Sequence, residues 1–193
     1  MSPTLMQATL AFCLTLFCIW ALSPIATRLG LVDAPNHRKQ HEGSIPLVGG
    51  IAIYLALLVA TLLWGQTQGG NEGLRTDIIY VFLAAGGMLV VLGILDDRYN
   101  LSVLTRVLAE IGVALFLIES LELRLSNLGD FAGLGKVKLS AWLSYPFTVL
   151  IIFVVINAYN MLDGMDGLLG IIVLITIFAF HLFSGLPPGL ITI

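Results

Sequence analysis

Long runs of apolar residues, separated by short polar connections, set the pattern of this chain. Six of the runs approach the roughly 20 residues that a helix needs to cross the hydrocarbon core of a bilayer. We therefore predict an all-α integral membrane protein, a polytopic bundle of about six transmembrane helices in a single membrane domain over residues 1–193. The predicted helices span residues 5–24, 46–64, 78–95, 102–121, 142–162 and 168–186.

The composition agrees with a chain whose main solvent is lipid. Hydrophobic residues make up 58% of the chain and charged residues 11%, whereas about 25% of a typical soluble domain is charged. The mean hydropathy is +0.99. The net charge of −3 and the lack of any basic stretch longer than Arg38-Lys39 argue against a nucleic-acid partner. The sequence says nothing of the oligomeric state.

Positive charge orients the predicted bundle. No Lys or Arg precedes Arg28, whereas Arg28, Arg38 and Lys39 follow the first apolar run directly. By the positive-inside rule, the N-terminus lies outside and the first connection lies in the cytoplasm. The whole-chain distribution of Lys and Arg is nearly even, so the orientation rests on the first helix. That helix has no basic leader and no clear cleavage site, so we expect it to stay attached as an anchor.

The longest outer connection, about residues 122–141, contains two stretches of alternating polarity with glycines between them. This pattern predicts a small extracytoplasmic β-hairpin. An irregular loop is the alternative.

Polar residues gather in the connections after the first, third and fifth helices, which this orientation places on the cytoplasmic face. Asp96 and Asp97 end the third helix, and the first connection carries Lys39 and His41. The fifth helix runs into residues 157–167, which hold two amides, two carboxylates and two glycines. Three distant segments thus bring carboxylates, amides and cations to one surface, as a site for a charged substrate requires.

The acidic residues predict a metal site. The neighbouring carboxylates of Asp96 and Asp97 repel each other unless a cation compensates them, and oxygen ligands select hard cations such as Mg²⁺. A solvated charge run that ends the helix is the alternative for Asp96, Asp97 and Arg98 taken alone. An EF-hand calcium loop is excluded at residues 157–167, because the downstream Glu is missing and the segment adjoins a membrane helix.

Helical spacing predicts further contacts. Residues three apart are neighbours on a helix, so the two amides and two carboxylates of residues 157–167 form one polar edge. Arg106 and Glu110, four residues apart in the fourth helix, are expected to pair with each other toward the bundle interior, with structure and substrate contact as the two alternatives for their role. Lys39 and His41 supply positive charge and proton-transfer capacity, which suit a diphosphate or a nucleotide. For a single basic residue of that loop, contact with lipid headgroups is the alternative.

Four segments, residues 32–41, 45–50, 92–98 and 157–170, together resemble the polyprenyl-phosphate N-acetylhexosamine-1-phosphate transferases of glycosyltransferase family 4. The first connection is most similar to the undecaprenyl-phosphate GlcNAc-1-phosphate transferases that initiate O-antigen and related glycans. It is less similar to the peptidoglycan translocase that acts on UDP-MurNAc-pentapeptide, which is the alternative within the family. The resemblance implies transfer of a sugar 1-phosphate from a UDP-sugar to undecaprenyl phosphate, with release of UMP, at the cytoplasmic face of a bacterial inner membrane.

The resemblance also implies roles for individual residues. Its cofactor is Mg²⁺, with Mn²⁺ as a substitute, and the spacing does not single out the aspartate that binds the metal directly. Its partners are undecaprenyl phosphate, a UDP-N-acetylhexosamine and the lipid bilayer. The implied catalytic residues are Asp96 and Asp97, the metal residues are Asp97, Asp163 and Asp166, and the substrate-binding residues are Lys39, His41, Asn157, Asn160, Asp163 and Asp166.

Members of the family have about ten or eleven transmembrane helices, with a further acidic ligand and a His-rich loop in later segments. The resemblance therefore implies that residues 1–193 are the N-terminal portion of such a fold, and we expect a chain of this length to be inactive by itself. Two other classes are alternatives: a cation-coupled transporter and an aromatic-acceptor prenyltransferase. A transporter needs polar groups at mid-membrane depth and often shows inverted repeats, whereas these acidic pairs lie at helix ends. The prenyltransferases space their aspartates four apart, unlike Asp163 and Asp166.

Overall fold

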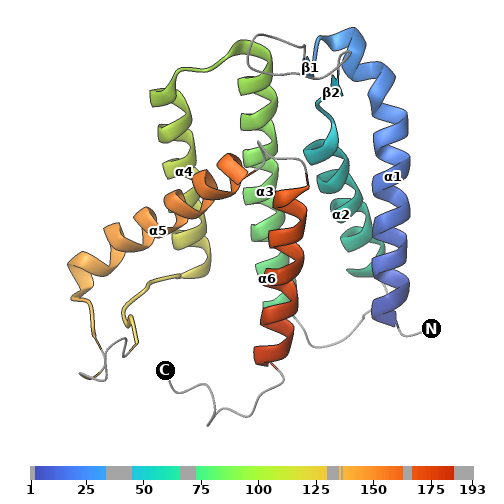
Figure 1. The fold of residues 1–193 in the computed structure, drawn as a ribbon. Coiled ribbons are helices and arrows are strands. Elements are labelled where there is room, and N and C mark those ends of the chain that lie inside the picture. Colours follow the sequence, from blue (N-terminus) through green and yellow to red (C-terminus); the bar gives the residue numbers. More distant parts are fainter. Residues whose placement is uncertain are drawn as a thin grey trace. The chain divides into compact units, whose positions relative to one another are not determined.

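A computed structural model describes residues 3–33, 45–65, 73–129, 135, 137–162 and 167–184. Within these residues every predicted apolar run forms a helix, and the all-α prediction is confirmed (Figure 1). Two short strands, which the sequence did not predict, flank the first connection. The elements are α1 (Pro3–Leu29), β1 (Val32–Asp33), β2 (Ile45–Pro46), α2 (Gly49–Gly65), α3 (Gly73–Tyr99), α4 (Val103–Leu121), α5 (Ala141–Leu162) and α6 (Leu168–Ser184).

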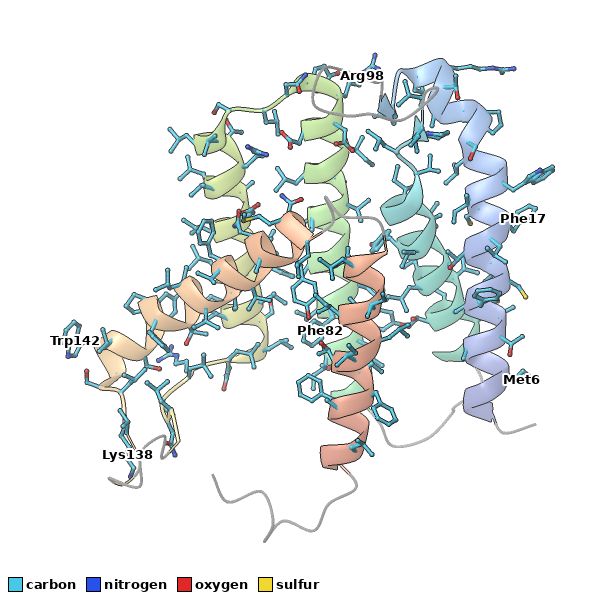
Figure 2. All side chains as sticks on the ribbon, in the orientation of Figure 1. Met6, Phe17, Phe82, Arg98, Lys138 and Trp142 are labelled. Carbon is cyan, nitrogen blue, oxygen red and sulfur yellow. The ribbon has the colours of Figure 1, made fainter. Side chains whose placement is uncertain are left out.

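The distribution of side chains is that of a protein in lipid. Large apolar residues are exposed, among them Trp20 at 75% and Trp142 at 77%, and Figure 2 shows Phe17 and Trp142 directed away from their helices. Many buried positions instead hold small residues such as alanine, which let membrane helices approach closely. The chain is an integral membrane protein. Three described helical segments are long and apolar enough to span a bilayer, namely Ala8–Leu29, Asp77–Tyr99 and Ala141–Leu162, whereas the number of spans and their orientation stay predictions.

The backbone divides into two compact units, Met1–Ala109 and Glu110–Ile193. In the first unit, α1 packs on α2 and α2 packs on α3. The α2–α3 contact depends on small residues, because the ring of Tyr54 lies against Gly86 and Gly87 of α3. The Tyr54 hydroxyl donates a hydrogen bond to the main-chain carbonyl of Leu83 at 3.1 Å. A methyl group in place of hydrogen at either glycine would therefore meet an aromatic ring.

Replacing Gly87 by Ala is expected to destabilise the first unit. A Cβ atom at Gly87 would lie 2.6 Å from the Tyr54 hydroxyl oxygen, so the ring must move and the bond to Leu83 is lost. The cost of overpacking and of the lost hydrogen bond should exceed the gain of about 1 kcal/mol from the higher helix propensity of Ala. The free energy of unfolding should therefore fall by about 1 kcal/mol. The check is the thermal unfolding midpoint, followed by circular dichroism in detergent micelles.

Gly93→Ala is the matched control, because no atom lies within 4 Å of a Cβ atom at Gly93 on the same helix. Its midpoint should stay level or rise. Equal shifts in the two variants would show that the Tyr54 contact does not limit the residue at position 87.

In the second unit, two buried hydroxyl groups of α5 hold the connection that precedes it. The Leu125 amide donates to Thr148 Oγ1 at 3.0 Å, and Ser144 Oγ donates to the Leu125 carbonyl at 2.9 Å. Beyond this clamp the backbone pairs antiparallel at Asn127 and Lys138, with flanking hydrogen bonds of 2.9 and 3.0 Å. Residues 130–134 and 136 of the predicted hairpin lie outside the described residues, and the side of the membrane on which it lies stays a prediction.

Candidate functional site

The acidic pair of the sequence lies in the last turn of α3. Asp97 is exposed, and Asp96 is half-buried. The carbonyl end of a helix carries partial negative charge, so two carboxylates in its last turn are unfavourable unless cations compensate them. The local structure supplies two arginines near this helix end.

Arg106 is the first of these arginines, and a tight turn brings it back to the helix it follows. Asn100, with φ of 48°, ends α3 in the left-handed conformation that Asn tolerates, and its amide donates to the Asp96 carbonyl at 2.8 Å. Ser102 then caps α4, accepting a hydrogen bond from the Thr105 amide at 3.2 Å. The Arg106 guanidinium, one turn into α4, forms an ion pair of 3.1 Å with Asp96 Oδ2. One oxygen of Asp96 is therefore held in place.

Arg98, the second arginine, ties the end of α3 to the end of α1. Its guanidinium donates to the main-chain carbonyl of Leu29, and Figure 2 shows Arg98 at this end of the helices. Gly30, with φ of 71°, turns the chain out of α1, and the Leu31 amide closes the helix end on the Ala26 carbonyl at 2.9 Å. A cation at a helix C-terminus is favourable. Arg98 therefore has a bonded position rather than being part of a purely solvated charge run.

The ends of the first connection are anchored beside the acidic turn. β1 and β2 pair antiparallel, with Val32 opposite Pro46 and Asp33 opposite Ile45. The residues next to them, Leu31 and Val48, form a buried apolar cluster with Ala26, against which Ile94 of α3 packs. Asp97 follows Ile94 by three residues, so the two lie on one face of α3. The chain thus leaves for the first connection, and returns from it, against the face of α3 that carries Asp97 one turn further on.

Lys39 and His41 belong to that connection and lie outside the described residues. The structure brings the base of their loop to the acidic turn, and the positions of the two side chains stay predictions.

The second polar group lies in the other unit, at the end of α5. Asn157 Nδ2 donates to Glu110 Oε2 of α4 at 2.5 Å and to the carbonyl of Phe153 at 3.0 Å. Asn160 is exposed on the same helix. α5 ends at Leu162, just before Asp163, and Gly167, with φ of 74°, leads into α6.

Asp163 and Asp166 lie outside the described residues. The predicted polar edge is therefore described only at its two amides, which share no hydrogen bond in the described structure. Since the acidic turn and the amides belong to different units, their meeting on one face stays a prediction.

The predicted pairing of Arg106 with Glu110 is wrong. Arg106 forms its ion pair with Asp96, and Glu110 accepts from Asn157. Residues four apart on a helix compete with partners from other elements, and here both residues have such partners. The charges of the two residues marked them as unusual in an apolar helix. Their spacing within α4, however, carried no information about partners in the neighbouring segments.

The described donors suit a hard divalent cation. Among the residues with described structure, no three His, Cys, Asp or Glu side chains form a cluster, and two of the predicted metal residues are not among them. The acidic turn nevertheless offers carboxylate oxygens without a thiol or imidazole, and Asp97 is exposed there. Oxygen donors of this kind fit Mg²⁺ or Mn²⁺.

Comparison with known proteins defines the class. The model of the glycosyl transferase family 4 matches residues 79–191, more than half of the chain. The protein belongs to glycosyl transferase family 4. No solved structure matches the chain significantly.

Three individual proteins of known name are similar to the chain. The chain is 37% identical over 155 residues to the undecaprenyl-phosphate alpha-N-acetylglucosaminyl 1-phosphate transferase of Yersinia pestis, a match that covers 79% of this chain and 40% of that protein. It is 36% identical over 150 residues to the enzyme of the same name in Escherichia coli K12, covering 78% and 38%. A probable undecaprenyl-phosphate N-acetylglucosaminyl 1-phosphate transferase of Bacillus subtilis is 32% identical over 165 residues, covering 83% and 43%. The matched region thus spans about 40% of the length of these relatives.

Proposed function

We propose that the full-length gene product transfers GlcNAc-1-phosphate from UDP-GlcNAc to undecaprenyl phosphate, giving a lipid-linked sugar diphosphate and UMP. The observation that carries the proposal is the family match, because residues 79–191 include both the acidic turn of α3 and the segment from Asn157 to Asp166. The names of the relatives supply the lipid acceptor and the sugar 1-phosphate. The UDP donor, a role in initiating cell-envelope polysaccharides such as O antigen, and a site on the cytoplasmic face of the inner membrane complete the proposal.

The reaction makes and breaks one bond at phosphorus. A phosphate oxygen of the lipid attacks the β-phosphorus of the UDP-sugar, and the bond from that phosphorus to the bridging oxygen breaks. UMP leaves with the bridging oxygen. Such a transfer depends mainly on aligning the attacking and leaving oxygens and on neutralising their charge. Lys39 and His41 suit this task, since the base of their loop packs beside the acidic turn.

The carboxylates have two tasks in this scheme. Asp97, Asp163 and Asp166 would hold Mg²⁺, or Mn²⁺ in its place, which when bound neutralises the diphosphate and polarises the attacked phosphorus. Asp96, held on one oxygen by Arg106, orients the acceptor phosphate, and one of the two adjacent aspartates serves as general base. Asn157 and Asn160 position the nucleotide.

Arg106→Gln is expected to lower kcat by about 10-fold, because Asp96 loses a charge-assisted hydrogen bond and its orientation. The Asp96–Arg106 pair is partly exposed, with side-chain exposures of 28% and 35%, so the free energy of unfolding should change by less than about 1 kcal/mol. Arg106→Lys should recover part of the lost rate. Steady-state kinetics and a detergent melt of each variant measure the two effects.

Arg124→Gln is the matched control, because that arginine lies 5.7 Å from the Tyr145 ring and away from the acidic turn in sequence. It should leave kcat unchanged. A fall in kcat for Arg106→Gln that only follows a loss of folded protein would contradict a role in orienting Asp96.

The proposed function is tested by the substrate requirement of UMP formation. The full-length gene product, purified in detergent, should form UMP only when UDP-GlcNAc, undecaprenyl phosphate and Mg²⁺ are all present. UDP-MurNAc-pentapeptide in place of UDP-GlcNAc should yield no UMP. Turnover of UDP-MurNAc-pentapeptide alone, or release of UDP instead of UMP, would contradict the proposal.

A further inference from the structure

Glu110 is the buried charged side chain of the described residues, with 5% of its surface exposed. It lies on α4 among buried apolar residues of the same helix, Val113, Ala114 and Ile118. A carboxylate in such surroundings is costly unless it is hydrogen-bonded, and α4 is predicted to cross the membrane, where an ionisable residue points to function. Its partner in the described structure is Asn157.

The hydrogen bonds of Asn157 fix the direction of its amide. Nδ2 carries two hydrogens, and both have acceptors: Glu110 Oε2 at 2.5 Å and the Phe153 carbonyl at 3.0 Å. A main-chain carbonyl only accepts, so the nitrogen of the amide, not its oxygen, must face Phe153. Oδ1 therefore points the other way, and no described residue donates a hydrogen bond to it.

A carboxylate is the side chain best suited to enforce this direction. An ionised Glu only accepts, so it binds the Nδ2 side of an amide and repels the Oδ1 side. A Gln at the same place can bind either side, and an apolar residue binds neither. A hydrogen bond to an ionised acceptor is also roughly twice as strong as one to a neutral acceptor.

We propose that Glu110 is a positioning residue, which holds the Asn157 amide so that Oδ1 accepts a hydrogen bond from an N–H or O–H group of the nucleotide sugar. This inference rests on the proposed function for the identity of the ligand, whereas the orientation of the amide follows from the contacts alone. Glu110 itself touches no reacting atom. Its effect passes through Asn157 and should appear mainly in substrate binding.

The kinetic test compares Glu110→Leu with Glu110→Gln in the full-length gene product. Leu fills a similar volume without an acceptor, and its KM for UDP-GlcNAc should rise by about 30-fold with kcat within about threefold, as for lost uniform binding. Gln restores an acceptor, and its KM should rise by no more than about threefold. The control is Glu119→Leu on the same helix, whose exposed carboxylate accepts from the Tyr145 hydroxyl at 2.7 Å. It should leave KM unchanged.

A double-mutant cycle separates positioning from a merely structural effect. If Glu110 acts through Asn157, then Glu110→Leu should raise KM no further in a protein that already carries Asn157→Ala. If the effects of the two substitutions on KM multiply in the double variant, the proposal is overturned. A KM for Glu110→Leu within twofold of the wild-type value would also overturn it.

A spectroscopic experiment tests the positioning of Asn157 without measuring turnover. In protein labelled with ¹⁵N-asparagine, the Asn157 side-chain signal, identified by its loss in Asn157→Ala, should lie downfield and exchange slowly. Glu110→Leu should abolish both properties, and Glu110→Gln should keep them. Wild-type protein with this signature but without UMP formation would refute the transferase proposal and not the positioning. An Asn157 signal unchanged in Glu110→Leu would refute the positioning, whatever the activity.

Discussion

Replacing Asp97 by Asn in the full-length gene product should reduce the rate of UMP formation by about 1,000-fold or more, equal to about 4 kcal/mol of transition-state stabilisation. Asp97 is exposed in the last turn of α3, where the helix end adds partial negative charge and so favours a bound cation. Asn keeps the shape of the side chain and removes its charge. The loss should therefore appear in protein that still folds, which circular dichroism in detergent checks.

Asp77→Asn is the matched control for this substitution, because Asp77 is also exposed on α3 and lies near its other end. Its rate should equal that of the wild type. If Asp97→Asn retains turnover within about threefold of the wild-type rate, the acidic turn is not the catalytic centre.

Removal of divalent metal is the second change with a large expected effect. Chelation by EDTA should lower UMP formation by at least about 1,000-fold, because the charge on the three phosphates is then no longer neutralised. Added Mg²⁺ or Mn²⁺ should restore the rate. Ca²⁺ should restore much less, since it prefers longer bonds and more ligands.

The metal requirement should also depend on the acidic turn. Replacing Asp97 should raise the Mg²⁺ concentration that gives half of the variant's maximal rate, while the Asp77 control should leave this concentration unchanged. Full activity after exhaustive chelation would contradict metal-assisted transfer at this site.

The helices of this protein could be predicted from the sequence because lipid imposes a simple rule. Apolar runs of the right length must form helices in order to satisfy their own backbone hydrogen bonds, and all six predicted runs do so in the described structure. The strands beside the first connection could not be predicted, because Val32–Asp33 and Ile45–Pro46 are too short to show a pattern. Leu31 and Val48, on either side of the paired strands, pack instead on residues distant in sequence, namely Ala26 of α1 and Ile94 of α3.

The candidate site, too, could be predicted from the sequence only in part. Its acidic and amide residues were identified from the sequence because two adjacent carboxylates and a cluster of amides are unusual at the ends of apolar helices. The hydrogen-bond partners of the residues around the site were not identified from the sequence. Arg98 bonds to a main-chain carbonyl of α1, and Glu110 bonds to a side chain of α5, 47 residues further along the chain. Such contacts depend on how the helices pack, and helical spacing predicted the wrong partner for Glu110.

The most direct test of the central claim follows the β-phosphate of the donor. UDP-GlcNAc carrying a radiolabel on that phosphate is incubated with the full-length gene product, undecaprenyl phosphate and Mg²⁺, and the lipid and nucleotide products are separated. Transfer of a sugar 1-phosphate predicts that the label moves to the lipid fraction and that unlabelled UMP forms in equal amount. Label that stays with the nucleotide while the sugar moves to the lipid would contradict this account.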